Sequence, residues 1–334
     1  MQPFFPEQVF FEEQALDYKL GEELWQLFAE RRTPRSIVES HNKVRIDEED
    51  PRKRFIKAKK TLVVGVKKDL RFQSCRPSAD YRLVTTTSCP GKCQYCYLAT
   101  NLGERVYLRI YVNLNEILAK VDDILEKSDR KVTTFEASSS SDPIATEHLT
   151  GSLARIISFF GKRNDARLRV VTKFDYIDSI LGVAHNQHTR FRFSLNAREV
   201  IRKYEHGTAN LEERLQAAKR ILEDGYPIGF ILAPLMVFPG WRDQYRELVS
   251  EMAKYLGSQQ AMTIELIMHR FTTRAKRVIK KRFPGSSLEM DKELREHKGF
   301  GKYVYPEDQA RELSEYLQSL IDEYLPGAEV EYFT

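Results

Sequence analysis

Three closely spaced cysteines are the residues whose types and spacing point most directly to chemistry. Cys89, Cys93 and Cys96 lie in the segment TTTSCPGKCQYCYLAT, and Cys75 is the only other cysteine of the chain. Three thiolates at a C-x3-C-x2-C spacing can turn inward from one short loop and bind a 4Fe-4S cluster, which leaves one iron without a protein ligand. Such an open iron can hold a substrate or a cofactor.

Zinc is the competing interpretation of the three cysteines. A structural zinc site needs a fourth Cys or His nearby. The segment CPGKCQYCY contains no His, and His148 and His185 lie far away in sequence. The N-terminal MQPFFPEQVFFEEQ lacks a basic start followed by an apolar core, and no apolar run is long enough to span a membrane. We therefore expect a cytoplasmic protein with reduced thiols, in which a disulfide framework is disfavoured.

Positive charge is concentrated in two segments rather than spread evenly. The chain has 53 Lys and Arg against 48 Asp and Glu, a net charge of +5. RKRFIKAKK at 52–60 and HRFTTRAKRVIKKRFPG at 269–285 interleave basic residues with aromatic and aliphatic ones. This pattern is typical of a phosphate-binding surface, and a solvated helix face explains it equally well.

Strand and helix patterns alternate through the middle of the chain. Apolar residues recur at helical spacing, and the helices predicted from them are 113–127, 146–161, a short one at 176–184, 211–225 closed by Gly225, and 244–256. Runs with strand composition predict six strands, at 81–87, 131–138, 166–173, 190–197, 227–234 and 262–269. Together they make six strand-then-helix steps.

This alternation predicts the fold class. Parallel pairing is expected because each helix returns the chain to the same edge of the sheet. Six units are too few to close an eight-stranded barrel, so we expect an α/β fold with a partial (β/α)6 barrel. The cysteine loop and the segments EASSSSD, TK, SLN and LAP follow these strands, and active sites of such barrels lie at the C-terminal strand ends.

The flanking regions are expected to extend the barrel. Residues 1–80 form a less regular N-terminal extension with one clear strand at 61–66. Residues 81–270 form the barrel. Residues 271–334 form a C-terminal part with the basic segment, a Gly-rich turn KGFGKYVY and a helix at about 306–325.

The cysteine loop resembles that of the radical S-adenosylmethionine (AdoMet) superfamily, because Tyr95 supplies the aromatic residue of C-x3-C-x-aromatic-C. Further blocks resemble the spore photoproduct lyase family from about Gln8 to Thr334, among them SHNKVR, PSADY, VTKF, GYPIGFILAP and the terminal EYFT. The resemblance implies repair of a methylene-bridged thymine dimer to two thymines. In that family a 5′-deoxyadenosyl radical, formed from AdoMet at the cluster, removes a hydrogen from the lesion.

The resemblance also implies roles for individual residues. The cluster ligands would be Cys89, Cys93 and Cys96. AdoMet would be contacted by side chains at strand ends and by one backbone position, namely Tyr95, Glu136, Ser141, Lys173, Ser194, Asn196 and Ala233. Lys173 would meet the AdoMet carboxylate, and Glu136 its amino group.

One departure concerns the hydrogen donor. The family's donor to the product radical is a cysteine, and Ser139 stands at the matching position. A hydroxyl O–H bond is too strong to replace a thiol here, so the chain is an engineered variant, uses another donor or catalyses a changed reaction. Tyr97 matches a position of the family's radical relay, and we expect it to supply the hydrogen directly. Cys75 is expected to be incidental.

The resemblance predicts a DNA-binding face in the C-terminal part. Base flipping needs a group that fills the space left by the extruded base, and the hairpin that does this is shorter here, with His297 and Lys298 in place of an Arg-Tyr pair. The residues expected to contact DNA are Arg270, Arg274, Lys276, Arg277, His297, Lys298, Lys302 and Tyr303.

The expected partners are damaged DNA with a thymine lesion and an electron donor such as flavodoxin or ferredoxin. We expect a monomer that binds no membrane. Two alternatives stay open: a radical AdoMet relative that acts on another nucleic-acid lesion or base, and a nucleic-acid-binding module with structural zinc.

Overall fold

The computed structural model describes residues 2–334. The chain divides into two compact units. Unit 1 comprises Met1–Gly91, Asn101–Thr172 and Tyr176–Arg190, and unit 2 comprises Lys92–Thr100, Lys173–Asp175 and Phe191–Thr334. The division into 1–80, 81–270 and 271–334 stays a prediction.

The first sheet of unit 1 is built largely from the N-terminal region. Its strands are β1 (Gln8–Glu12), β2 (Arg35–Val38), β3 (Thr61–Gly65), β6 (Thr86–Thr87) and β7 (Leu108–Tyr111), in the order β2-β1-β3-β7-β6. All neighbours are parallel except β6 and β7. Helix α1 (Lys19–Glu30) buries Leu24 and Phe28 in the same apolar core as β1 and β3. The strand predicted at 61–66 is confirmed as β3, whereas β1 and β2 were not predicted.

The second sheet of unit 1 carries strands β9 (Ala166–Thr172), β8 (Thr133–Glu136), β5 (Ala79–Arg82) and β4 (Ser74–Cys75), in that order. The single strand predicted at 81–87 was wrong, since it is divided between β5 and β6 in different sheets. The backbone changes partner there: Leu83 N–H donates to Glu136 O at 2.9 Å, whereas Thr85 O accepts from Tyr111 N–H at 3.0 Å.

The helices of unit 1 include α2 (Pro51–Lys59), which Asp50 caps and which was not predicted. The helix predicted at 113–127 is confirmed as α4 (Leu114–Glu126). The helix predicted at 146–161 is two helices, α5 (Ile144–Thr150) and α6 (Ser152–Gly161), because Gly151 has a φ of +56°. The short helix predicted at 176–184 was wrong, since only a single 3-10 turn forms, at Asp178–Ile180.

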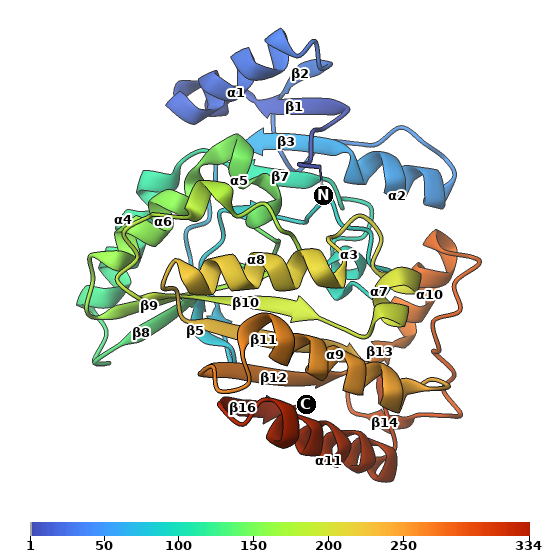
Figure 1. The fold of residues 1–334 in the computed structure, drawn as a ribbon. Helices are drawn as coiled ribbons and strands as arrows, with labels where there is room; N and C mark the ends of the chain where they lie inside the picture. The colour runs from blue at the N-terminus through green and yellow to red at the C-terminus, as the bar shows by residue number, and fades with distance from the viewer. Residues whose placement is uncertain (1) are drawn as a thin grey trace. The chain divides into compact units, whose positions relative to one another are not determined.

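Unit 2 has a parallel sheet in the order β10 (Thr189–Leu195), β11 (Ile228–Leu235), β12 (Met262–Met268) and β16 (Ala328–Phe333). Helices α8 (Leu211–Glu223), α9 (Trp241–Leu256) and α11 (Glu307–Tyr324) run along it (Figure 1). Gly225, with a φ of +86°, follows the end of α8, which confirms the predicted helix stop. Strand β16 was not predicted.

The basic C-terminal segment forms a separate small structure within unit 2. Strand β13 (Phe271–Thr272) leads into α10 (Thr273–Arg282), and β14 (Glu296–Lys298) and β15 (Lys302–Val304) form a hairpin. The three strands pair antiparallel in the order β13-β15-β14. Within residues 2–334, no helix is both long and apolar enough to cross a membrane.

Candidate active site

The cysteine loop is held by backbone hydrogen bonds in unit 2. Lys92 N–H donates to His206 O at 2.7 Å, and Gln94 N–H donates to Tyr204 O at 2.9 Å. Cys96 N–H closes a turn onto Cys93 O at 3.2 Å, and the chain then enters α3 (Tyr97–Asn101). Cys93 is buried, and Cys89 and Cys96 are partly buried.

The donor chemistry of this loop fits an iron–sulfur cluster. Thiolates are soft ligands that bind iron–sulfur clusters well, and no Asp, Glu or His lies between Thr85 and Thr100 to compete with them. Among residues 2–334, no group of three or more His, Cys, Asp or Glu is arranged to hold a metal ion. The cysteine assignment therefore stays a prediction.

The serine run after β8 lies against the segment that precedes Cys89, within unit 1. Ser88 N–H donates to Ser140 O, and Ser140 Oγ donates to Thr86 O, both at 2.8 Å. The Ser141 and Thr86 hydroxyls share a short hydrogen bond, and Ser141 is buried. The structure thus brings the predicted Ser141 next to the strand that leads into the cysteine loop.

Glu136 joins this serine run to the hairpin that contains Cys75. The buried Glu136 carboxylate accepts from Ser78 Oγ at 2.9 Å and from Ser138 N–H at 3.0 Å. Cys75 lies on β4, which pairs with β5 beside β8. The Ser139 hydroxyl oxygen is buried without a hydrogen-bond partner in residues 2–334, which is costly unless a ligand contacts it.

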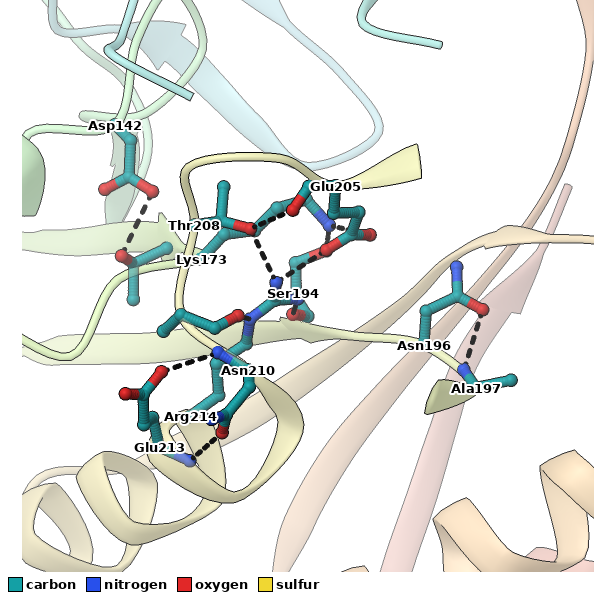
Figure 2. Close-up of polar contacts among 12 residues, drawn as sticks. Asp142, Lys173, Ser194, Asn196, Ala197, Glu205, Thr208, Asn210, Glu213 and Arg214 are labelled. Atoms are coloured by element: carbon teal, nitrogen blue, oxygen red, sulfur yellow. Dashed lines mark hydrogen bonds and ion pairs between the residues drawn. The ribbon is translucent and has the colours of Figure 1, made fainter. Parts of the chain in front are cut away.

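A charged network in unit 2 connects several predicted AdoMet residues (Figure 2). Lys173 Nζ donates to Ser194 Oγ at 2.8 Å and to Glu205 Oε1 at 3.0 Å. The opposite oxygen of Glu205 accepts from Arg214 Nη2 at 2.6 Å, and Arg214 also donates to Ser194 O at 2.8 Å. Glu205 and Arg214 are both buried. The network fixes the side chain of Lys173 and the end of β10.

Tyr95 extends the same network. Its hydroxyl donates to Glu205, and Lys173 Nζ lies 5.8 Å from its ring centroid. Burial and the neighbouring Glu205 raise the pKa of Tyr95 well above its usual value, so the phenol is protonated. Burial opposes ionisation of Glu205, but the charges of Arg214 and Lys173 prevail and lower its pKa to about 2.

Asn196, a predicted AdoMet contact, is hydrogen-bonded to the backbone around it. Its amide donates to Pro234 O at 2.8 Å, and its Oδ1 accepts from Ala197 N–H at 2.9 Å (Figure 2 shows the second bond). Asn196 is fully buried. It therefore positions the backbone next to Ala233, another predicted AdoMet contact.

Sequence reasoning missed Glu205 and Arg214. Arg214 lies on the apolar side of α8 with Leu211, Leu215 and Ala218, all of them buried. A charged residue at such a position is a signal of a buried ion pair. Glu205 follows α7 (Arg198–Tyr204) in a short loop, where no periodic pattern marks it.

The predicted DNA-binding residues lie on the small antiparallel sheet, on α10 and just before them. The exposed ones are Arg270, Arg274, Arg277, His297, Lys298 and Lys302, whereas Lys276 and Tyr303 are partly buried. Tyr303 stacks on Phe271 with centroids 5.3 Å apart. Phe300, which sequence reasoning missed, is fully exposed between Gly299 and Gly301 with a φ of +61°. Tyr97 is 65% exposed.

Comparison with known proteins identifies the class of protein to which this chain belongs. A family model described as spore photoproduct lyase matches residues 4–334. The chain is 44% identical to the spore photoproduct lyases of Geobacillus sp. strain Y412MC61, over 100% of both chains, and of Bacillus subtilis strain 168, over 99% of both. It is thus an enzyme of the lyase class. The chain belongs to the spore photoproduct lyase family.

A solved structure supports the same conclusion. It is a spore photoproduct lyase variant in which one cysteine is replaced by alanine and one serine by cysteine, with bound AdoMet and dinucleoside spore photoproduct. Its TM-score with this chain is 0.97, at 44% identity and complete coverage of both chains. The fold class predicted from the strand–helix alternation, a partial (β/α)6 barrel with extensions, is confirmed.

Proposed function

We propose that this chain repairs the methylene-bridged thymine dimer in DNA by a radical mechanism that uses AdoMet and a 4Fe-4S cluster. The observation that carries the proposal is the cysteine triplet, Cys89, Cys93 and Cys96, in a chain that matches the lyase family from end to end. When bound, the cluster and AdoMet supply a 5′-deoxyadenosyl radical. The protein's own residues bind, orient and protect the reacting groups.

The unit 2 network supports a role in AdoMet binding. Hydrogen bonds to Ser194 and Glu205 hold the Lys173 ammonium group in place within the protein. A cation held in this way can bind the AdoMet carboxylate at low entropic cost. Tyr95, hydrogen-bonded to Glu205, presents an aromatic ring for the adenosyl group. In unit 1, Glu136 and Ser141 are proposed as the polar contacts, as the resemblance implies.

The sequence predicted Tyr97 as the hydrogen donor and Cys75 as incidental. We propose Cys75 as the donor instead and keep Tyr97 as the alternative. Two contacts support Cys75: β4 pairs with β5, and Glu136 joins the Ser78 end of this hairpin to the serine run that contains Ser139. The thiol hydrogen passes to the product thymine radical and leaves a thiyl radical. Tyr97 and Tyr95 would then relay a hydrogen back to the thiyl radical, with the AdoMet-derived adenosyl group as its source.

The C-terminal cations support DNA binding. Exposed Arg274, Arg277 and Lys302 can neutralise phosphates, so affinity should fall steeply as salt rises. Phe300 at the tip of the β14–β15 hairpin offers an apolar group that can stack in the space left by an extruded lesion. A damaged DNA strand is therefore the proposed partner, with an electron donor such as flavodoxin or ferredoxin. Monomeric state and cytoplasmic location stay predictions.

Anaerobic reconstitution followed by assay on dinucleotide and duplex lesions tests the function. We expect a brown protein with absorbance near roughly 400 nm that restores thymine. A loaded cluster that cleaves AdoMet but never restores thymine contradicts the proposed substrate. A colourless protein with stoichiometric zinc contradicts the cysteine assignment.

The donor is tested by product analysis in deuterated solvent with two variants. Thiol and phenol hydrogens both exchange, so deuterium should enter the repaired thymine in the wild type. With Cys75→Ser we expect clean repair to fall at least tenfold, with side products, whereas Tyr97→Phe should leave the first turnover intact and slow later ones. The reverse pattern assigns the donor role to Tyr97. Ser139→Cys should restore clean repair in the Cys75→Ser background.

A further inference from the structure

Lys59 is a buried lysine that points at the first cysteine of the triplet. It ends α2 and is only 3% exposed. Its Nζ donates to Cys89 O at 2.8 Å and to Ser88 Oγ at 3.3 Å. Although the sequence RKRFIKAKK suggested a solvated or phosphate-binding face, this member of the run faces inward.

Arg109 is a second buried cation beside the same segment. It lies on β7, is 4% exposed and rests over the Tyr107 ring, 4.2 Å from its centroid. Its guanidinium donates to Thr87 Oγ1 at 3.2 Å and to His41 O at 3.4 Å. Lys59 and Arg109 thus contact residues 87–89 independently, from a helix and from a strand.

The two cations are not paired with an acidic side chain in the described part of the chain. Within residues 2–334, no Asp or Glu forms an ion pair with Lys59 or Arg109. Three buried arginines elsewhere in the fold behave differently: Arg192 pairs with Glu265, Arg214 with Glu205 and Arg295 with Glu289. A buried charge without a counter-charge costs several kcal/mol, so an anion outside the polypeptide is needed to compensate the two cations.

We propose that Lys59 and Arg109 are the counter-charges of the iron–sulfur cluster. The inference rests on the proposed assignment of Cys89, Cys93 and Cys96 as its ligands. Three thiolates bring negative charge to the loop whose first carbonyl accepts from Lys59. A fixed positive charge there stabilises the thiolates and favours the reduced, more negative cluster, because net charge and hydrogen bonding near the sulfurs set the reduction potential.

The experiment is a redox titration of the anaerobically reconstituted full chain, followed by electron paramagnetic resonance in the absence of AdoMet. Lys59→Gln keeps an amide donor for the Cys89 carbonyl but removes the charge. We expect its cluster to be about tenfold harder to reduce, a shift of about 59 mV to more negative potential for a one-electron couple. Lys59→Arg should stay within threefold of the wild type, and Arg109→Gln should shift in the same direction.

Lys53→Gln is the matched control, since Lys53 is exposed on the same helix and carries the same charge. A Lys59→Gln protein with full iron and the wild-type potential overturns the proposal. Lys59→Gln could also bind less iron than the wild type. In that case, full iron loading of Lys59→Arg supports the proposed role of the positive charge. An equal loss of iron in both variants overturns the proposal. A wild type that binds no iron refutes the cysteine assignment instead, so the two failures are distinguishable.

Discussion

Two regions of the molecule treat buried charge in opposite ways. In unit 2, the Glu205 carboxylate is shared by Lys173, Arg214 and Tyr95, so positive and negative groups meet within the polypeptide. In unit 1, Lys59 and Arg109 donate to carbonyls and hydroxyls, among them those of residues 87–89, and to no carboxylate within residues 2–334. The first arrangement can form before any cofactor binds, whereas the second is complete only with an external anion.

The buried carboxylates show the same contrast. Glu205 has two cationic partners, and its pKa falls to about 2. Glu147 in unit 1 is buried and accepts from the backbone N–H groups of Leu153 and Ala154 at the start of α6 and, more weakly, from the Thr150 hydroxyl. No cation pairs with it within residues 2–334, so burial raises its pKa to about 7. The comparison indicates that partners, and not burial alone, decide the charge state of an interior acid.

The largest effect is expected from breaking the unit 2 network. Glu205→Gln leaves the buried Arg214 and the partly buried Lys173 without their shared counter-charge, so the free energy of unfolding should fall by about 3–5 kcal/mol. Urea denaturation of the cofactor-free chain at pH 7 measures it. The depressed pKa of Glu205 also means that wild-type stability is lost as pH falls from 4.5 toward 2, and the variant should lack this acid loss.

Glu199→Gln is the control for this variant. Glu199 is a partly exposed glutamate on α7 that pairs with Arg202 and Lys203, and its loss should change stability by less than about 0.5 kcal/mol. If Glu205→Gln lowers the free energy of unfolding no more than this control does, Glu205 is not the shared counter-charge of Lys173 and Arg214.

Glu147 should give the next largest effect, with the opposite pH dependence. Its folded-state pKa of about 7 exceeds the ordinary 4.5, so its contribution is fully present below pH 4.5 and declines as pH rises to 7. At about 1.4 kcal/mol per pKa unit the total is about 3 kcal/mol. Urea unfolding at several pH values should show this slope in the wild type and not in Glu147→Gln. Identical slopes in the two proteins would contradict the raised pKa.

The sequence predicted well those features that depend on local patterns. Strands β8 to β12 follow apolar runs bounded by turn residues, and Gly225 marks a helix end, so local patterns sufficed. The partners of Lys173 did not follow from any local pattern, because Glu205 lies 32 positions further along the chain. Ser139 was found only because a family position matched, and its lack of a hydrogen-bond partner depends on packing.

Lys59 shows why burial within a basic run escapes sequence reasoning. The sequence alone does not distinguish the lysines of RKRFIKAKK from one another. Tertiary packing buries Lys59 and leaves Lys53 and Lys57 exposed. Phe300 escaped for the converse reason, because an isolated aromatic in a Gly-rich turn has no periodicity that would mark it as exposed. The charge pattern identified both regions as basic, but not which of their cations are buried.

A double-variant cycle sharpens the comparison further. Lys173→Met leaves Glu205 with Arg214 as its one cationic partner, and Glu205→Gln removes the counter-charge of both cations. The double variant removes both partners of one ion pair. We expect the double variant to be more stable than the sum of the single changes by about 1–3 kcal/mol. Chemical denaturation of the four proteins gives this coupling energy. Strict additivity would mean that Lys173 and Glu205 do not interact.

The smallest effect is expected from Ser194→Ala. It removes one acceptor of Lys173, at 2.8 Å, but leaves Glu205 as the other partner, and the Arg214 bond to the Ser194 carbonyl is unaffected. Stability should therefore fall by only about 1 kcal/mol. AdoMet affinity of the reconstituted enzyme, measured by equilibrium binding, should fall more than stability does, because Ser194 orients a cation proposed to bind the AdoMet carboxylate. If AdoMet affinity is unchanged, Ser194 serves the fold alone, and the unit 2 network owes its geometry to Glu205 and Arg214.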